Sequence, residues 1–386
     1  MTQVFDLRQT DDARDLIHRT VQALSEGNVV GLPTDTVYGL AAHALNPDAV
    51  ARLLELTGNE SSPLAISVRS RQAAEDFFWP ASGLVKRLSH RCWPGPLTLV
   101  TTCTDAHSAI TGLPPSVRSQ ITGDGGQIGF RVVKHRILEG IHRFMAAPLV
   151  LTSANWPSDR PQSDAASLLE QHAGQIPLLL DDGPTRYGGH STIVEVIGNR
   201  WKILREGVIE RAAMNQFVKP VIVMVCTGNT CRSPMAETLM REQLRKRFGC
   251  EDAVRVLSAG VAANPGMSAS PQSIEVMGEK KLDLTGHSSQ PLTEDLMNTA
   301  DLVLTMTRSH RSAILAAWPE MQNQVFTLRQ DSGDIGDPIG MPTEAYRQCA
   351  EQMEKEITFW LDKLGQDLVP ESCNDNGPSN EDKESA

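Results

Sequence analysis

One short stretch, residues 221–239, limits the possible folds of this chain more than any other. It reads VIVMVCTGNTCRSPMAETL: an apolar run, a polar loop with two cysteines, and a segment with Pro234 near its start. The apolar run is typical of a buried β-strand, and proline in the first turn is typical of a helix start. A short loop between a strand and a helix N-terminus gathers backbone N–H groups and aims the helix dipole at them. The stretch therefore predicts an α/β unit with an anion site at the end of a strand.

The same alternation of strands and helices runs along the whole chain. Short β-branched runs alternate with helical stretches in both halves, which is the α/β pattern. The predicted strands are 29–32, 97–101, 149–151 and 192–196 in the first half, and 221–225, 302–305 and 325–328 in the second.

Length and composition suggest where the chain divides. A length of 386 residues fits two domains of roughly 150–200 residues each. Val218-Lys219-Pro220 precedes the apolar strand, so we expect one domain at 1–208, a connector at 209–219 and a second domain at 220–365. The C-terminal end, PESCNDNGPSNEDKESA, is polar and acidic, so 366–386 are predicted to form a disordered tail.

Charge and cysteine usage exclude several protein classes. The formal net charge of −11 argues against a protein that coats nucleic acid, although a local basic cleft would still be compatible with it. No window approaches the ~18 consecutive apolar residues of a membrane span, and the N-terminus lacks the features of a signal peptide. The seven cysteines are mostly isolated, which favours thiols in a reducing cytoplasm.

The loop after the apolar run carries a specific chemistry. Cys226 stands at the strand end, where the helix dipole would favour a thiolate, and Arg232 offers a planar fork for two phosphate oxygens. Gly228 permits a close backbone approach, and Asn229 tolerates the left-handed conformation. A zinc site would need further ligands at suitable spacing, and CTGNTC supplies a single pair of cysteines. The pattern predicts a nucleophilic cysteine in a phosphate cradle, with no metal.

These residues resemble the low-molecular-weight protein tyrosine phosphatases over roughly residues 220–362. The resemblance rests on VCTGNTCRSPMAE, on SAG at 258–260 and on GHSSQPLTEDLMNTADLVLTMT at 286–307. It implies a doubly wound parallel sheet and a phosphatase without a cofactor that acts on a phosphorylated protein. By the same likeness, Cys226 forms a cysteinyl-phosphate, Arg232 binds phosphate and stabilises the transition state, and Ser233 hydrogen-bonds the thiolate. The phosphate-binding loop would comprise Thr227, Gly228, Asn229, Thr230, Cys231 and Ser233.

A leaving group needs a proton, so a carboxylic acid must face the cradle. The family keeps this acid in an Asp-Pro pair near its C-terminus, and this chain has Asp337-Pro338 in GDIGDPIGMPTEAY. The resemblance thus implies that Asp337 is the general acid and then the base for hydrolysis. Asp331 and Asp334 lie nearby but lack the following proline.

Two loop residues leave alternatives open. Cys231 either guards Cys226 by forming a reversible disulfide or simply fills the loop as a small residue. Thr230 stands where the tyrosine-specific members carry a bulky aliphatic residue, and the loop is more similar to the branch that acts on protein phosphoarginine. Because a hydroxyl suits a guanidinium and no tyrosine follows Asp337-Pro338 to stack on a ring, phosphoarginine and phosphotyrosine both remain candidates.

The first half contains six separated fragments, in this order: EGNVVGLPTDTVYGLAAHA, CWPGPLTLV, IGFRVVKH, PLVLTSAN, DDGPTRYGGHSTIVEV and ILREG. Together and in this order they resemble the YrdC/TsaC-like family over about residues 12–208. The resemblance implies a twisted α/β sheet that makes threonylcarbamoyl-adenylate from threonine, bicarbonate and ATP, the last with Mg²⁺. It also implies tRNA or the tRNA-modification machinery as a partner.

The same likeness assigns residues to this reaction. Thr34 and Arg131 would hold threonine, and Thr152, Ser153 and Asn155 would line the reaction centre. Ser191 and Thr192 would face the pocket from a strand, while Arg205 would contact the phosphates of ATP or the adenylate. A zwitterionic amino acid needs a cation for its carboxylate, and a triphosphate needs several.

One region departs from the family pattern. The family has a Lys-x-Arg pair, then Asn-Pro-Leu and a histidine, whereas this chain has no Lys or Arg between Arg52 and Arg69, Ser62 before Pro63, and Ser67 at the histidine position. The loss of two cations predicts weaker ATP binding. The first half is therefore either a synthase or a non-catalytic nucleotide- or RNA-binding module. For RNA, the basic rim would be formed by Arg69, Arg71 and Arg118.

Overall fold

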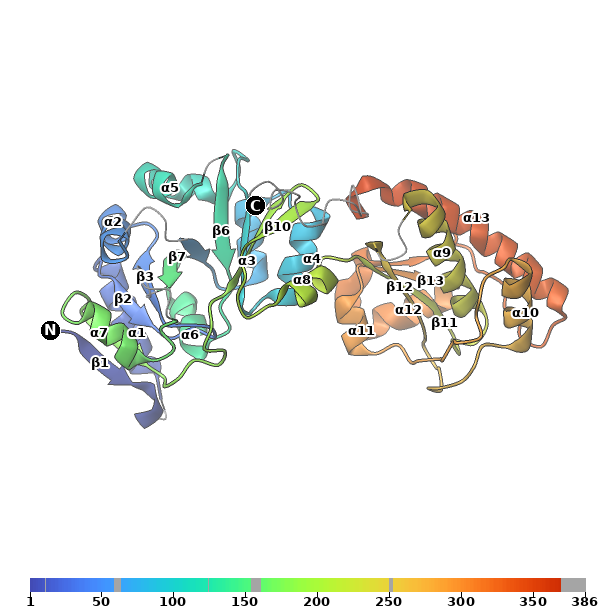
Figure 1. Ribbon diagram of the computed structural model, residues 1–386, viewed down its shortest axis with the longest axis horizontal. Coiled ribbons are helices and arrows are strands. Elements are labelled where there is room, and N and C mark those ends of the chain that lie inside the picture. The colour runs from blue at the N-terminus through green and yellow to red at the C-terminus, as the bar shows by residue number, and fades with distance from the viewer. Residues whose placement is uncertain (11, 59–63, 124, 154–160, 250–252, 369–386) are drawn as a thin grey trace, which may run out of the picture. The chain divides into compact units, whose positions relative to one another are not determined.

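The chain forms two compact units, Met1–Val218 and Lys219–Ala386 (Figure 1). The computed structural model describes all residues except 11, 59–63, 124, 154–160, 250–252 and 369–386. Each unit has its own sheet and its own core, which confirms the predicted α/β class. Among the described residues, no helix is both long and apolar enough to cross a bilayer.

The second unit is built on a four-stranded sheet in which every pair is parallel, in the order β12-β11-β13-β14. The strands are β11 (Val221–Cys226), β12 (Arg255–Gly260), β13 (Leu302–Thr305) and β14 (Val325–Thr327). Parallel strands need crossover connections, and here helices supply them. The first strand of this unit, β11, lies between β12 and β13, and the predicted doubly wound parallel sheet is confirmed.

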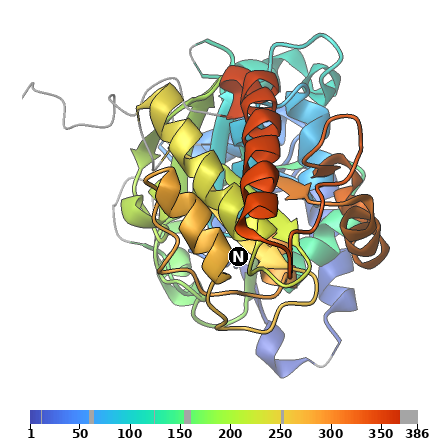
Figure 2. The same ribbon diagram turned by 90° about the vertical axis from the view of Figure 1, so that its right-hand side faces the viewer.

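Alternate side chains of β11 enter two different cores. Ile222 and Met224 pack with helices of one face, whereas Val223 and Val225 pack with helices of the other. The first face is covered by α9 (Arg232–Phe248), α10 (Pro271–Glu279) and α13 (Thr343–Leu368), which lie side by side in Figure 2. The second face is covered by α11 (Glu294–Thr299) and α12 (Arg308–Ala317). A strand buried on both faces explains the unbroken apolar run 221–225.

Helix α9 has clear signals at both ends. It begins at Arg232, directly after the loop, and ends before Gly249, whose φ of 70° lies in the left-handed region that favours glycine. Arg245, Lys246 and Arg247 occupy the last turn, where cations interact favourably with the helix dipole. The N-terminal end of this helix consequently stays directed at the loop after Cys226.

The first unit is built on a ten-stranded sheet that mixes parallel and antiparallel pairs, in the order β1-β8-β2-β3-β7-β4-β6-β5-β9-β10. Its strands are β1 (Gln3–Asp6), β2 (Val30–Leu32), β3 (Gly39–His43), β4 (Ala65–Ser67), β5 (Leu97–Thr102), β6 (Gln127–Arg131), β7 (Leu149–Ser153), β8 (Leu178–Asp181), β9 (Thr192–Ile197) and β10 (Arg200–Arg205). Every strand predicted from the sequence occurs in one of the two sheets, with ends shifted by at most two residues.

Helices cover both faces of this sheet. One face packs against α1 (Arg14–Ser25) and α6 (Arg136–Phe144). The other face packs against α2 (Pro47–Leu56), α3 (Arg71–Phe78), α4 (Gly83–Cys92), α5 (Pro115–Ile121) and α7 (Ala165–His172). Successive strand residues alternate between these cores, as the pleat of a strand requires.

The segment that the sequence suggests as a connector belongs largely to the first unit. Within 209–219, α8 (Arg211–Phe217) forms a short helix, and the side chains of Ile209 and Met214 are buried in the core. Arg87 Nη1 donates to the carbonyl oxygen of Val218 at 2.7 Å. At the other end, residues 366–368 of the suggested tail continue α13, and the remainder lies outside the described residues.

Candidate functional site

The loop between β11 and α9 curves around the sulfur of Cys226. The backbone N–H of Asn229 donates to Cys226 Sγ at 3.2 Å. Within the described part of the chain, the N–H groups of Gly228, Thr230 and Cys231 donate to no protein acceptor. Free N–H groups at a helix N-terminus form an anion-binding concavity. The predicted cradle is thus present as a geometry, with the sulfur at its floor.

Asn229 organises the loop through both ends of its side chain. Its φ is 55°, in the left-handed region anticipated for it. Its Nδ2 donates to Ser233 Oγ at 3.0 Å and to Ser258 Oγ at 2.9 Å, and its Oδ1 accepts from the N–H of Gln290 at 2.8 Å. Ser233 Oγ accepts from Asn229 Nδ2, lies 3.0 Å from Cys226 Sγ and lies 3.3 Å from the carbonyl oxygen of Ala259, so its single proton is shared between these last two acceptors.

The end of β12 holds the loop in place. Val261 N–H donates to Cys226 O at 3.0 Å, and Ala262 N–H donates to Thr227 O at 2.9 Å. A Cβ on Gly260 would lie 2.4 Å from the carbonyl oxygen of Thr227, so this position requires glycine. The SAG sequence at 258–260 therefore has a direct physical role in shaping the cradle.

Arg232 and Asp337 meet at the mouth of the cradle. The Arg232 side chain is only 5% exposed, and it donates to Ile335 O at 3.2 Å and to Asp337 Oδ2 at 2.5 Å. The Asp337 side chain is 42% exposed, so it is open to a ligand. The two other carboxylates of this region are engaged elsewhere: Asp334 with Arg308, and Asp331 with Arg329. Geometry thus singles out Asp337 as the acid that faces the cysteine loop.

Cys231 is buried next to the C-terminal helix. Its Sγ lies 3.8 Å from the hydroxyl of Tyr346 and 3.7 Å from Thr230 Oγ1. Burial raises the pKa of Tyr346, with the contact to Cys231 as a second cause. Cys226 and Cys231 are both free thiols in this structure.

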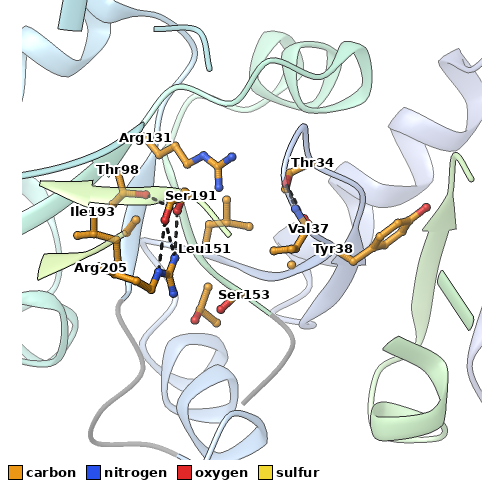
Figure 3. A pocket seen from close by; sticks show the side chains of 13 residues that line it. Thr34, Val37, Tyr38, Thr98, Arg131, Leu151, Ser153, Ser191, Ile193 and Arg205 are labelled. Carbon is orange, nitrogen blue, oxygen red and sulfur yellow. Dashed lines mark hydrogen bonds between the residues drawn. The ribbon is translucent and has the colours of Figure 1, made fainter. Parts of the chain in front are cut away.

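The first unit holds a pocket of about 420 Å³, its open mouth included. Most of the polar residues predicted for this half line it: Thr34, Arg131, Thr152, Ser153, Ser191 and Arg205. Figure 3 shows Arg131 and Arg205 on opposite sides of Ser191, with Ser153 below Arg205. Asn155 lies outside the described residues.

Arg131 is neutralised within the protein. Its Nη2 donates to Asp35 Oδ1 at 2.8 Å and to Thr36 Oγ1 at 2.7 Å, and the side chains of Arg131 and Asp35 are 7% and 1% exposed. Burial lowers the pKa of Arg131, and the charge of Asp35 opposes this effect. Arg131 Nε and Asp35 Oδ2 are buried and have no hydrogen-bond partner among the described residues.

Arg205 is the other cation of the pocket. It donates to Ser191 O at 3.1 Å and to Ser191 Oγ at 3.1 Å, and Ser191 Oγ lies 3.0 Å from Thr98 Oγ1 (Figure 3). Burial, followed by repulsion from Arg131, lowers the pKa of Arg205 to about 10. Arg205 therefore stays cationic at neutral pH, and within the described residues it has no carboxylate partner.

Comparison with known proteins matches each of the two units to a family. The family model described as low molecular weight phosphotyrosine protein phosphatase matches residues 221–370. The family model for Sua5, YciO and YrdC, described as telomere recombination, matches residues 22–207. The protein-arginine-phosphatase of Bacillus subtilis is 41% identical over 150 residues, which cover 38% of this chain and 97% of that protein. The chain belongs to the low-molecular-weight phosphatase family, and its first unit is a Sua5/YrdC domain.

Two further relatives match the chain, one for each domain. A probable low molecular weight protein-tyrosine-phosphatase of Ralstonia nicotianae is 34% identical over 144 residues, 37% of this chain and 94% of that protein. The threonylcarbamoyl-AMP synthase of Bacillus subtilis is 30% identical over 221 residues, 57% of this chain. The chain spans 61% of the length of that synthase.

Thr192 of the YrdC domain does not lie where the sequence places it. Its Oγ1 donates to Ile209 O at 2.8 Å and accepts from the N–H groups of Gly207 and Ile209 at 3.1 and 3.0 Å. The side chain is fully buried and is absent from the pocket lining. Ser191 directly precedes β9, which begins at Thr192, and of the two only Ser191 lines the pocket.

Sequence reasoning missed several residues of the two sites. Asp35, inside the quoted PTDT, is the buried partner of Arg131; its position next to Thr34 was the available signal. In the phosphatase domain, His287 Nε2 contacts Asn229 O at 2.7 Å, and His310 Nε2 contacts Thr227 Oγ1 at 2.9 Å.

Ser67, at the end of β4, is paired with a histidine. His142 Nε2, from α6, lies 3.0 Å from Ser67 Oγ, and both side chains are buried. Burial lowers the pKa of His142 to about 4, so its ring is neutral at neutral pH. Neither residue lines the pocket that contains Arg131 and Arg205.

Proposed function

We propose that the phosphatase domain hydrolyses phosphorylated protein side chains through a covalent intermediate on Cys226. The thiolate attacks phosphorus, the bond from phosphorus to the leaving atom breaks, and Asp337 gives its proton to that atom. Asp337 then takes a proton from water, whose oxygen attacks phosphorus and releases phosphate and the thiolate. Arg232 and the free loop N–H groups stabilise the charge on the phosphoryl oxygens.

The observation that supports this proposal is the set of polar groups that surrounds the sulfur of Cys226. Asn229 N–H and Ser233 Oγ lie 3.2 and 3.0 Å from its sulfur, while Arg232 and Asp337 are paired at the mouth. Cys231 would protect the nucleophile as a reversible disulfide partner, which its place in the same loop supports. The reaction requires no cofactor.

For the substrate we favour phosphoarginine over phosphotyrosine. Thr230 presents a hydroxyl rather than a bulky aliphatic group, and it is held by the bond from Ser270 N–H to its carbonyl at 2.8 Å. The protein-arginine-phosphatases of Bacillus subtilis and Geobacillus stearothermophilus are 41% and 40% identical, and the tyrosine phosphatase of Ralstonia nicotianae is 34% identical. Ile339, which is 67% exposed, follows the Asp-Pro pair in place of an aromatic ring.

The test is the turnover of phosphoarginine and phosphotyrosine peptides by the full chain. Cys226→Ser should abolish both activities, whereas Cys103→Ser, a matched change in the other domain, should leave them intact. Thr230→Ile should shift the preference toward phosphotyrosine. Undiminished turnover by Cys226→Ser would refute the assignment of the nucleophile.

For the YrdC domain we propose binding of threonine and ATP and formation of threonylcarbamoyl-adenylate for tRNA modification. The convergence of the predicted residues in one pocket supports it, as does the similarity to threonylcarbamoyl-AMP synthases. Arg205, cationic and without a carboxylate partner in the described chain, is suited to an anionic group of the ligand.

The competing function is a nucleotide- or RNA-binding module without synthase activity. It is favoured by the absence of Lys and Arg between Arg52 and Arg69 and by the neutralisation of Arg131 by Asp35. Pyrophosphate release that depends on ATP, threonine and bicarbonate decides between them. Robust release supports the synthase; binding of ATP or RNA without release supports the module.

A further inference from the structure

Thr227, the residue directly after the nucleophile, is tied to a histidine that the proposed mechanism does not use. Thr227 is exposed, and its Oγ1 lies 2.9 Å from His310 Nε2. His310 belongs to the first turn of α12, and its side chain is only 6% exposed. A buried ring therefore reaches across to a hydroxyl at the open edge of the phosphate loop.

The surroundings of His310 fix where its proton lies. Its Nδ1 is buried and has no hydrogen-bond partner among the described residues. A buried N–H without an acceptor costs more than a lone pair without a donor, so the proton resides on Nε2. Burial and the nearby Arg232 lower the pKa of His310, against the opposing charges of Asp337 and Asp334. The neutral ring thus donates from Nε2 to Thr227 Oγ1.

This direction of donation determines what Thr227 offers to a ligand. A hydroxyl has one proton and two lone pairs, and His310 occupies one lone pair. Thr227 Oγ1 has no second partner among the described residues. Its proton and its other lone pair therefore remain available at the edge of the cradle, next to Cys226.

We propose that Thr227, held by His310, determines specificity by recognising the P–N–H unit of a phosphoramidate. Its proton donates to a phosphoryl oxygen, and its free lone pair accepts the N–H beside phosphorus. An aryl phosphate ester offers only acceptors at these positions, so it gains half of this interaction. His310 is a positioning residue, because it acts through Thr227 alone. The inference rests on the proposed phosphatase function and extends it to the choice of substrate.

The experiment measures kcat and KM of the full chain on matched phosphoarginine and phosphotyrosine peptides. Thr227→Val keeps the shape and removes the hydroxyl, and Thr227→Ser keeps the hydroxyl. We expect Thr227→Val to lower kcat/KM for phosphoarginine by about tenfold or more, as for other lost polar contacts to a substrate, and to lower it for phosphotyrosine by only about threefold, because the ester loses one of the two contacts. Thr227→Ser should stay close to the parent.

Variants of His310 separate positioning from folding. His310→Leu should reproduce the loss for phosphoarginine, and His310→Gln, which still carries an N–H donor, should restore part of it. The double variant with Thr227→Val should be no worse than Thr227→Val alone, since the two residues act as one unit.

Equal losses for both peptides in Thr227→Val would overturn this inference, as would a loss in His310→Leu that persists in the Thr227→Val background. Such results would leave the proposed nucleophile, tested with Cys226→Ser, untouched. A parent protein that hydrolyses phosphotyrosine but not phosphoarginine would instead overturn the proposed substrate, and this inference with it.

Discussion

The two sites use the same kinds of side chain in opposite ways. Each combines an arginine, an aspartate and several hydroxyls at the ends of strands in an α/β sheet. In the phosphatase domain, the partner of Arg232 is Asp337, whose side chain is 42% exposed and can leave the pair when a phosphate enters. In the YrdC domain, the partner of Arg131 is Asp35, whose side chain is 1% exposed. The two arginine side chains are about equally buried, at 5% and 7% exposed, so the exposure of the aspartate partner is what distinguishes the two pairs.

The largest expected effect is on the arginine that serves a ligand. Arg232→Lys keeps the charge but loses the planar fork, so we expect kcat/KM on a phosphorylated peptide to fall by about 10²–10³-fold. The unfolding midpoint should change less than the activity, because lysine keeps the positive charge beside Asp337. Steady-state kinetics and thermal unfolding of the same preparation check both statements.

A matched control exists on the same helix. Arg241→Lys also alters an arginine that donates to a backbone carbonyl, that of Val256 at 2.7 Å, but it lies outside the loop. This variant should keep parental kinetics. If Arg232→Lys and Arg241→Lys lose activity equally, the contrast between serving a ligand and holding the fold is wrong for this domain.

The buried pair of the YrdC domain should behave in the reverse manner. Asp35→Asn leaves Arg131 as an uncompensated buried charge, so we expect the free energy of unfolding of this domain to fall by about 3–5 kcal/mol. The phosphatase activity of the same protein should persist below the new midpoint, since the two units have separate cores. Denaturant titration with a probe in the first unit, such as its tryptophans, measures the change.

If Asp35→Asn lowers the free energy of unfolding by less than about 1 kcal/mol, the pair with Arg131 contributes no more than an exposed ion pair does. This result would contradict its role in stabilising the fold. A useful comparison is Asp15→Asn, which breaks the exposed pair with Arg19 on α1 and should cost little.

Burial also makes the YrdC domain sensitive to acid through His142. The pKa of this ring is about 4 when folded, against 6.5 for the unperturbed group. Between these values the unfolded chain binds a proton that the folded chain does not, so stability falls as pH drops from 6.5 to 4. The loss should reach on the order of 2–3 kcal/mol, and His142→Gln should remove that part of it.

Unfolding curves of the parent and of His142→Gln at pH 7, 6, 5 and 4.5 test this slope. Burial also lowers the pKa of His135, so this residue contributes to the acid sensitivity of both proteins. The difference in unfolding free energy between the parent and His142→Gln at each pH isolates the contribution of His142. Parallel curves would exclude His142 as the source of the acid sensitivity.

The phosphatase site was predictable because its parts are local. Cys226, Asn229, Arg232 and Ser233 lie within one strand–loop–helix unit, and the helix start fixes their geometry. Asp337 is remote, and the resemblance to a known family was needed to single it out from its acidic neighbours. His310 was not predictable, because its contact with Thr227 joins positions 83 residues apart.

For the YrdC pocket, the sequence predicts most of the residues that line it but not the ion pair that Arg131 forms. The sequence indicates Arg131 as a free cation for threonine, but its partner Asp35 lies 96 residues away, and only the folded sheet brings them together. Sequence reasoning also missed strands β1, β3, β4, β6, β8, β10 and β12. Of these, β3 and β4 are rich in Gly, Ala and Ser and pair with strands distant in sequence. Propensity carries little information for such segments.

The smallest expected effect is on the Thr192→Val variant. It separates a residue that stabilises the fold from one that lines the pocket. Thr192→Val removes a hydroxyl that bonds Ile209 O and the N–H groups of Gly207 and Ile209, so the free energy of unfolding should fall by about 1–2 kcal/mol. Ligand affinity of the YrdC pocket, measured well below the midpoint, should be unchanged. Ser191→Ala removes a hydroxyl that does line the pocket and contacts Arg205 Nη2 at 3.1 Å, so it should weaken ligand binding with less effect on stability. A Thr192→Val variant that loses affinity at full stability would return Thr192 to the pocket, because a residue that acts only through folding cannot produce that result.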